Sequence, residues 1–499
     1  MRAHRSSPAS SGWGRSGSGS PRSRRRTGRS IDGHDPPRVG RLTTRSTETQ
    51  DRIDPSRASE AYDRIVSAFR AGGSEFVTVD FRALFPEVGA TERATHNLHP
   101  YPAKLLRHIP AFLVAAEQVS PPDAVVLDPF CGSGTTLLEA LLASRPAIGV
   151  DVNPLATLLA KVKTTAVGLS RARRALDATL KRARKLRAPN VRNRPRLEYW
   201  FEDQTLLDLA RLRMSIESVH DPDTKDLLDL SLSIAVRDVS LADPRISVPV
   251  RLRPERYPPD HWLRAPMTKR LSDVRGIDTM AVFERVARYA IERVARLEAL
   301  PRRSISVRRA DARLLADDAR STQLCPESID LILTSPPYLG AQKYIRACSL
   351  NLLTLDLADG ETLGHLTDQS VGREHFRKSE YTRRLPTAIS EADDVIDECH
   401  GRDPLRACLA ATYLRDMREA LRSMTRLVRP GGAVVIVAGN NTLSGVEFPT
   451  PRFLEALAHE QGLVTELRVL DVIRSRGLMT RRNRSASVID HESVMVFRK

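Results

Sequence analysis

Residues 124–128 (AVVLD) run directly into residues 129–136 (PFCGSGTT), and together they decide the fold. The first four are a short apolar run, which is typical of a strand buried on both faces of a sheet. Residues 137–142 (LLEALL) begin a helix, and residues 147–151 (AIGVD) form a second strand that ends in an acidic residue. Strand, glycine loop, helix and strand make one βαβ unit, which predicts an α/β fold with a doubly wound sheet.

The α/β pattern is interrupted and then resumes. Further strands are predicted at residues 304–307, 329–333, 432–437 and 493–497. Before them, residues 166–300 contain long basic helical stretches around a proline-rich middle, residues 244–266. We therefore expect a sheet with helices on both faces, interrupted by a mainly helical insertion.

The composition is strongly basic. The 499 residues include 78 Lys and Arg against 61 Asp and Glu, and the first fifty hold eleven arginines against three acidic residues. An excess of this size favours a polyanionic partner such as nucleic acid. Residues 1–55 are rich in Ser, Arg, Gly and Pro and have no apolar periodicity. We expect a disordered basic tail there, with non-specific phosphate contact or an organelle transit peptide as the alternatives.

Composition also bears on the compartment. No apolar run approaches the roughly 18 residues that a membrane-spanning helix needs, so no membrane partner is expected. The five cysteines are odd in number and include no CxxC pair. Neither a disulfide framework nor a zinc ribbon is therefore predicted, and a reducing cytoplasm fits best.

The glycine loop is the first site with chemical meaning. Gly132 and Gly134 let a ligand approach the backbone at the carboxyl end of a strand, where open α/β sheets bind nucleotides. The loop has neither the GxGxxG spacing of dinucleotide sites nor the GK[ST] ending of a P-loop. Asp128 suits a ligand with an ammonium group, and Asp151 is placed to accept hydrogen bonds from ribose hydroxyls. The combination predicts a cationic nucleoside; a tight turn before a packed helix is the alternative.

The second site is the TSPPY segment, residues 334–338, which follows the apolar strand at 329–333. Its two prolines stiffen the loop and bring no N–H donors, and Tyr338 offers an aromatic face. The loop thus suits a planar amine, with an ordinary structural turn as the alternative.

DPFCGSGTT at residues 128–136, followed by TSPPY, resembles the amino-methyltransferases of DNA, which methylate exocyclic nitrogens with S-adenosylmethionine. Residues 96–104 (HNLHPYPAK) resemble the HPYPAK segment that precedes the glycine loop in many bacterial DNA methylases and borders the methionine part of the cofactor. RPGG at residues 429–432 resembles a turn common before a strand in enzymes that use this cofactor. The resemblance covers residues 61–165 and 300–499 and implies a Rossmann-like class I methyltransferase sheet.

The resemblance also implies a domain organisation. After the tail, residues 56–165 are expected to form the first part of the methyltransferase domain, with the cofactor motifs. Residues 166–300 are the helical insertion and the candidate target-recognition region. Residues 301–499 complete the domain and contain the catalytic motif.

S-adenosyl-L-methionine is the cofactor that the resemblance implies. Its expected ligands are Tyr101, Pro102, Lys104, Asp128, Phe130, Gly132, Gly134, Thr135, Asp151 and Asp311. Asp311 resembles the family acid that meets the adenine amino group, with Asp317 or Asp318 as alternatives. His96 and His99 have no convincing further ligands beside them, so no metal site is expected.

The expected catalytic residues are Ser335, Pro336, Pro337 and Tyr338. The family implies direct methyl transfer to an exocyclic amine, without a covalent intermediate. A carbon-5 cytosine methylase would need a Pro-Cys nucleophile, whereas residues 325–326 have Cys and Pro in the opposite order. Hydrogen bonds from the amine to Ser335 and to the Pro336 carbonyl would orient its lone pair, and Tyr338 would stack on the base.

Two signals disagree about the target base. The order of the motifs resembles a class that usually carries Asp-Pro-Pro-Tyr and methylates adenine, whereas Ser335 resembles the cytosine-N4 enzymes. We follow the serine and predict a site-specific DNA cytosine-N4 methyltransferase, of a restriction-modification system or an orphan of one. The alternatives are adenine-N6 methylation of DNA, guanine-N2 methylation of RNA, and a nucleic-acid-binding regulator without turnover.

The expected partners are double-stranded DNA, with the target base flipped out, and a cognate restriction endonuclease. Flipping costs a few kcal/mol, and aromatic stacking worth roughly 1–3 kcal/mol offsets much of it. Candidate DNA contacts in the insertion are Arg171, Arg173, Arg174, Arg182, Arg184, Arg251 and Arg253. For residues 171–187 a solvated helix face is the alternative. The predicted location is the cytoplasm, in association with the nucleoid, and no oligomeric state is predicted.

Overall fold

The computed structural model describes residues 52–73, 76–89, 93–102, 104–187, 195–299, 313–315, 318–340, 344–373, 376–473 and 491–499. Residues 1–51 of the predicted tail, the strand predicted at 304–307, and Asp311 lie outside these ranges. All described residues belong to one compact unit, residues 47–499.

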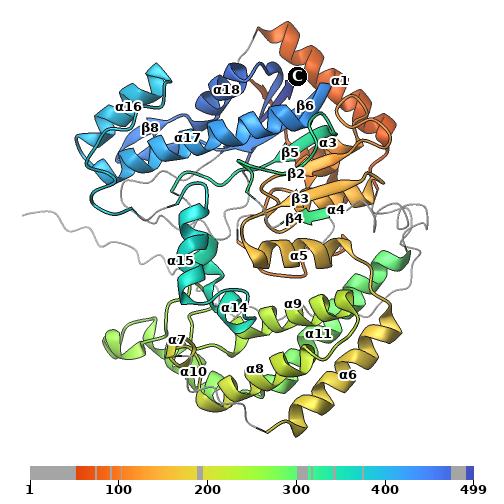
Figure 1. Ribbon diagram of the computed structural model, residues 1–499, viewed down its shortest axis with the longest axis vertical. Coiled ribbons are helices and arrows are strands. Elements are labelled where there is room, and N and C mark those ends of the chain that lie inside the picture. Colours follow the sequence, from red (N-terminus) through yellow and green to blue (C-terminus); the bar gives the residue numbers. More distant parts are fainter. Residues whose placement is uncertain are drawn as a thin grey trace, which may run out of the picture. The chain divides into compact units, whose positions relative to one another are not determined.

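An eight-stranded sheet organises this unit, in the order β1-β9-β10-β6-β5-β2-β3-β4 (Figure 1). Its strands are β1 (Val77–Thr78), β2 (Val126–Asp128), β3 (Ala147–Val150), β4 (Arg313–Leu315), β5 (Ile329–Thr334), β6 (Val428–Ala438), β9 (Val464–Val472) and β10 (His491–Arg498). Neighbouring strands pair in parallel except at β10, which is antiparallel to both β9 and β6. The predicted Rossmann-like sheet is thereby confirmed.

Helices cover both faces of this sheet (Figure 1). One face packs against α1 (Pro55–Gly72), α2 (Phe81–Leu84), α3 (His108–Ala115) and α4 (Thr135–Leu142). The other packs against α16 (Ser390–His400), α17 (Pro404–Leu427) and α18 (Thr450–Glu460), beside the small hairpin of β7 (Asn441–Leu443) and β8 (Val446–Phe448).

The alternation of side chains in β6 explains why both faces are apolar. Ala433 and Val435 belong to the core on the α3 side, whereas Val434 and Ile436 belong to the core on the α17 side. Successive residues of a strand point to opposite faces, so a continuous apolar run such as AVVIV supplies two cores at once.

The segment that interrupts the pattern is helical, which confirms the predicted insertion. It contains α6 (Leu169–Lys185), α7 (Pro195–Glu198), α8 (Asp203–Ile216), α9 (Pro222–Val239), α10 (Arg264–Arg275) and α11 (Thr279–Ala295). The starts of its long helices follow from the sequence. Asp221 accepts the N–H of Thr224 before α9, and Asp278 accepts the N–H of Ala281 before α11, as N-cap carboxylates do.

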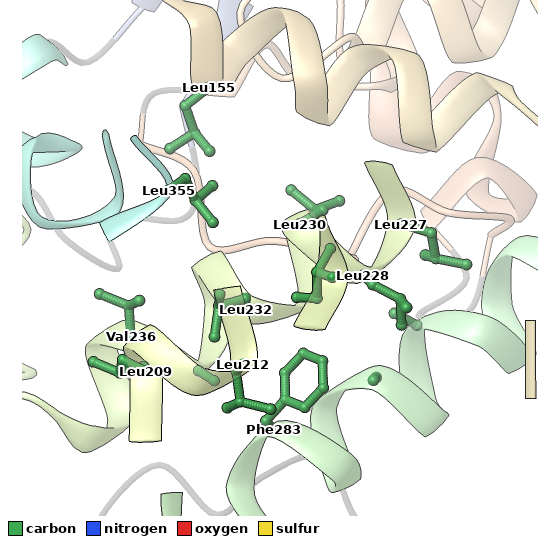
Figure 2. Close-up of a cluster of buried hydrophobic side chains, with 14 of the residues drawn as sticks. Leu155, Leu209, Leu212, Leu227, Leu228, Leu230, Leu232, Val236, Phe283 and Leu355 are labelled. Carbon is green, nitrogen blue, oxygen red and sulfur yellow. The ribbon is translucent and has the colours of Figure 1, made fainter. Parts of the chain in front are cut away.

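The helical segment packs onto the sheet part through α5 (Pro154–Thr164), which Figure 1 shows between the sheet and α9. Figure 2 shows the shared core, in which Leu212 of α8 and Phe283 of α11 lie close to α9. Leu155 of α5 and Leu355, just after α14 (Ser349–Thr354), belong to the same core. The insertion and the sheet therefore have one continuous apolar contact.

The RPGG segment differs from the expected turn before a strand, because it lies inside β6. Gly431 has a positive φ of 75°, and its N–H donates to the carbonyl of Lys499. The pairing of β5 with β6 shifts at this point, from Ile329–Val428 to Leu331–Ala433. The glycine pair thus forms an irregularity in the pairing of β5 with β6, and the carbonyl of Lys499 accepts the N–H of Gly431 there.

None of the helices within the described ranges combines the length and the apolar character that crossing a membrane requires.

Candidate active site

The two predicted loops meet at one cavity, because β2, β3 and β5 are neighbouring parallel strands whose carboxyl ends share an edge of the sheet. The cavity measures about 690 Å³, with the open space at its mouth included. Six of the predicted site residues line it: Tyr101, Phe130, Gly132, Asp151, Ser335 and Pro337. The structure therefore brings part of the predicted cofactor motifs and part of the predicted catalytic motif to one cavity.

Asp151 is one of two carboxylates that line this cavity in the described part of the chain, and Asp318 is the other. Oδ2 of Asp151 accepts the N–H of Gly132 at 2.9 Å, and its Oδ1 accepts the N–H of Asn153 at 2.8 Å. Burial raises the pKa of Asp151 to about 6, although these two N–H groups act in the opposite direction. The side chain is thus held by backbone donors and is ionised near pH 7.

Asp128 does not line the cavity but connects the two motifs. Its Oδ1 accepts the hydroxyl of Thr334 at 2.6 Å and the N–H of Phe130 at 3.2 Å. Burial raises the pKa of Asp128 to about 6, and the hydrogen bonds only partly offset this. The carboxylate therefore fixes the start of the glycine loop against the end of β5.

The two glycines of the loop serve different purposes. Gly132 lines the cavity, and a Cβ on it would lie 3.8 Å from Cε1 of Tyr101. Gly134 has a φ of +72°, and a Cβ there would lie 2.8 Å from both Cα and Cβ of Ala160 in α5. Gly134 is required because α4 approaches α5 closely. For this glycine the structure agrees with the alternative given above, a tight turn before a packed helix.

The HPYPAK segment contributes Tyr101 to the lining of the cavity. The hydroxyl of Tyr101 accepts a hydrogen bond from Nδ2 of Asn153 at 3.0 Å. Lys104 does not line the cavity. Its Nζ donates to the carbonyls of His99 at 2.6 Å and His96 at 3.3 Å, and burial lowers its pKa to about 8. Lys104 thus binds two backbone carbonyls of its own segment. Pro102 and Thr135 also lie away from the cavity wall.

A buried ion pair lies behind the segment. The guanidinium of Arg93 donates to both oxygens of Glu139, at 2.9 and 2.6 Å, and Nε2 of His96 lies 2.7 Å from Oε1. Burial favours the neutral acid, yet Arg93 and His96 lower the pKa of Glu139 to about 2. Burial lowers the pKa of His96 to about 4. These groups connect the segment to α4.

His99 faces a different partner. Its Nε2 lies 3.1 Å from Oγ of Ser233 in α9, and Nδ2 of Asn351 in α14 donates to the hydroxyl and the carbonyl of Ser233 at 3.0 and 2.7 Å. All three side chains are buried. Among the described residues, no three His, Cys, Asp or Glu side chains gather as metal ligands.

The predicted catalytic loop follows β5. Ser335 and Pro337 line the cavity, whereas Pro336, which is buried, and Tyr338 are not among its lining residues. The hydroxyl of Tyr338 donates to Oε1 of Glu492 in β10 at 2.8 Å. Sequence reasoning did not find Glu492, because 154 residues separate the pair and no motif surrounds it.

Other residues complete the wall. Asp311 lies outside the described residues, but its alternative, Asp318, lines the cavity. The carboxylate of Asp318 accepts from Nε of Arg320 at 2.9 and 3.1 Å, and Arg320 also donates to Asp416. Tyr344 and Val371 also line the cavity, and neither was predicted as a site residue. The sequence around them indicates helices but does not indicate a site.

Five of the seven candidate arginines of the insertion fall into two groups. Arg171, Arg173 and Arg184 on α6 face Asp221, Glu292 and Glu284 respectively, as expected for a solvated helix face. Arg251 and Arg253 instead surround the half-exposed ring of Tyr199: their guanidinium carbons lie 4.8 and 6.0 Å from its centroid. We call Tyr199, Arg251 and Arg253 the arginine–tyrosine cluster.

The doubly wound sheet brings a glycine loop and an SPPY loop to one cavity, as the resemblance to the amino-methyltransferases led us to expect. Residues 46–161 match a family described as DNA methylase, of the N6 and N4 type. This match confirms the resemblance over the range that contains the HPYPAK segment and the glycine loop.

Individual relatives agree with this assignment. The type II methyltransferase M.MvaI of Kocuria varians is 25% identical over 390 residues, which cover 74% of this chain and 81% of that protein. M.MjaII of Methanocaldococcus jannaschii, also a type II methyltransferase, is 31% identical over 87 residues, or 17% of this chain and 16% of its own length. A putative DNA modification methylase from Thermus thermophilus shares 18% identity, with a TM-score of 0.18 over 37% of this chain and 52% of its own. The fold assignment rests on the strand order and not on this last likeness.

Proposed function

We propose that the protein transfers a methyl group from S-adenosyl-L-methionine to the exocyclic N4 of cytosine at a specific DNA site, as the modification enzyme of a restriction-modification system. The observation that carries the proposal is the position of Ser335, which lines the same cavity as Asp151 and Gly132. A serine at the head of this loop resembles the cytosine-N4 enzymes. The likeness to M.MvaI, a type II methyltransferase, supports the assignment to restriction-modification.

The cavity fits this cofactor. Each oxygen of Asp151 accepts one backbone N–H, and a carboxylate oxygen has a second lone pair that suits a ribose hydroxyl. Gly132 exposes backbone, and Phe130 adds an apolar ring to the wall. Asp128 lies just behind the wall, where its negative charge would attract the ammonium group through a low dielectric. When bound, the cofactor supplies a methyl group activated by its sulfonium.

The remaining predicted ligands would act indirectly. Lys104 and Pro102 shape the segment that presents Tyr101, and Thr135 begins the helix that follows the loop. Asp318 is the described acid nearest in sequence to Asp311 that reaches the cavity, and we propose it for the contact with the adenine ring.

The chain's own groups would position the target amine. The hydroxyl of Ser335 and the carbonyl of Pro336 accept hydrogen bonds from it, which directs its lone pair toward the methyl group. Proline lacks an N–H, so neither Pro336 nor Pro337 contributes a competing donor at this point of the loop. The ring of Tyr338 would stack on the flipped cytosine. DNA would also contact the arginine–tyrosine cluster and Trp262, whose side chain is 67% exposed.

The test is transfer of labelled methyl from S-adenosylmethionine to a mixture of unmethylated genomic DNA and total RNA, followed by mass spectrometry of the nucleosides. We expect N4-methylcytosine from the DNA, and no label with Asp151→Ala. N6-methyladenine would mean that the order of the motifs outweighs Ser335. Label in RNA alone, or DNA binding without any transfer, would overturn the proposal.

A further inference from the structure

The direction of β10 brings a carboxylate to the catalytic edge of the sheet. Because β10 is antiparallel to β6, it begins where β5 and β6 end. Ser493 pairs with Ala438, the last residue of β6, and Glu492 precedes it. The catalytic loop leaves β5 on the other side of β6. Glu492 therefore stands across one strand from this loop.

The side chains of Tyr338 and Glu492 span that strand. The phenol hydroxyl donates to Oε1 at 2.8 Å, and both residues are partly buried. Burial raises the pKa of Tyr338 well above its usual range, so the phenol keeps its proton and remains the donor. Burial also raises the pKa of Glu492, and the bond from Tyr338 acts against this rise.

The two prolines restrict the backbone of this loop but not the side chain of Tyr338. Pro336 and Pro337 fix their own φ angles, whereas the two rotatable side-chain bonds of Tyr338 stay free. A stacking residue whose ring is already oriented loses less entropy when the base arrives. An anchor on the hydroxyl provides this orientation.

We propose that Glu492 is a positioning residue for Tyr338, holding its ring in place beside the cavity before the target base arrives. The inference rests on the proposed function, because it assumes that Tyr338 contacts a flipped base. Glu492 itself is not among the residues that line the cavity.

The chain offers a matched control for this contact. The hydroxyl of Tyr62 in α1 donates to Oε2 of Glu466 in β9, also at 2.8 Å. Neither residue lines the cavity. Substitution of this pair therefore measures how much the loss of a tyrosine–glutamate hydrogen bond changes the stability of the fold when no residue of the cavity is altered.

The experiment compares Glu492→Ala, Glu492→Gln, Tyr338→Phe and the double variant E492A/Y338F with Tyr62→Phe. For each full-length protein we would measure kcat and KM for methylation of unmethylated genomic DNA, the Kd for S-adenosylmethionine, and the urea midpoint. We expect Glu492→Ala and Tyr338→Phe each to lower kcat/KM by on the order of tenfold, with the cofactor Kd near wild type. The double variant should be no worse than either single one.

Glu492→Gln should restore most of the activity, because its amide oxygen still accepts from the phenol. Normal kcat/KM in Glu492→Ala, or additive losses in the double variant, would overturn the inference. If Glu492→Ala does not fold, Tyr338→Phe decides the question, because it keeps the ring and removes only the hydroxyl that binds Glu492: a kcat/KM near wild type in that variant would overturn the inference. A wild-type protein that methylates no DNA overturns the proposed function itself, which distinguishes the two failures.

Discussion

The hydroxyl of Thr334 donates a 2.6 Å hydrogen bond to Oδ1 of Asp128, joining the end of β5 to the end of β2. The two residues are 0% and 4% exposed, so water does not compete for the bond. Asp128 begins the glycine loop and Thr334 immediately precedes Ser335. One buried contact therefore sets the spacing between the loop proposed for the cofactor and the loop proposed for the base.

Thr334→Val removes this donor and keeps the shape of the side chain. We expect it to lower the free energy of unfolding at pH 8 by about 1–3 kcal/mol, because the Asp128 carboxylate loses a partner. The pKa of Asp128 is raised to about 6, so the folded protein takes up a proton there as the pH falls below that value. The loss should be smaller at pH 5, where the charge is neutralised. Equal losses in urea titrations at the two pH values would contradict this account.

Gly134→Ala should destabilise the protein through a clash and through backbone strain. The new Cβ would lie 2.8 Å from backbone and side chain of Ala160, at a φ of +72°. Gly73→Ala is the control, since its φ is +52° and nothing lies within 4 Å of its Cβ. Strain alone costs roughly 1–2 kcal/mol, and overpacking adds about 1–3 kcal/mol. A urea midpoint for Gly134→Ala equal to that of Gly73→Ala would show that α5 moves aside.

Glu139→Gln should cost about 3–5 kcal/mol at pH 7, because it leaves the Arg93 guanidinium buried without a counter-charge. The side chains of this pair are 2% and 1% exposed. Glu87→Gln, in the exposed pair with Arg57, should cost under about 1 kcal/mol. Urea unfolding of both variants makes the comparison.

The pH dependence adds a second check on Glu139. Its folded pKa, about 2, lies below its ordinary value of 4.5, so the stabilisation is complete above pH 4.5 and is lost as the pH falls toward 2. The difference between wild type and Glu139→Gln should shrink over that range. A difference that stays constant down to pH 2 would show that the ionised carboxylate of Glu139 is not the source of the stabilisation.

Cofactor binding should depend on the ionisation of Asp151. Because burial raises its pKa to about 6, the Kd for S-adenosylmethionine should stay level above that pH and increase below it, by roughly tenfold per unit. Isothermal titration calorimetry between pH 5 and 8 measures this. Asp151→Asn should bind weakly with little pH dependence, and a steep dependence in that variant would assign the titration to another group.

Arg253→Ala should flatten the salt dependence of DNA binding. Loss of one phosphate contact reduces the slope of log K against log salt concentration by about one. Arg173→Ala is the control, since that guanidinium lies 3.3 Å from Glu292 on a helix face. Fluorescence anisotropy with a mixed-sequence duplex, between about 50 and about 200 mM salt, gives both slopes. Identical slopes would remove the arginine–tyrosine cluster from the DNA interface.

Much of the sheet was predictable because its central strands are continuous apolar runs. AVVL before Asp128 and AVVIV in β6 are apolar throughout, and this follows from burial on both faces. The strand that was predicted at 432–437 extends from Val428 to Ala438, since RPGG forms an irregularity and does not end the pairing. Local pattern thus located β2, β3, β5, β6 and β10 but not their ends, and it did not predict β1, β4 or β9.

The site was predictable only where a motif carried it. Gly132, Asp151 and Ser335 meet at the cavity as their positions at strand ends led us to expect. Glu492 was not foreseen, because a tertiary contact between residues 154 apart brings it to Tyr338. An antiparallel last strand returns Glu492 to the catalytic edge, and nothing in its immediate sequence indicates this.

The hydroxyl of Ser233 constrains how the helical insertion could be exchanged for another. It lies in α9, yet His99 and Asn351, both outside the insertion, direct buried nitrogen atoms toward it. In a chimaera that replaced residues 166–300 with a foreign segment, Nδ2 of Asn351 could still donate to a backbone carbonyl at this position, as it does now. Nε2 of His99 would lose its partner unless a polar side chain stood there, at a cost of about 1–3 kcal/mol. Exchanging the candidate target-recognition region therefore requires a polar side chain at position 233 to be carried across with the graft.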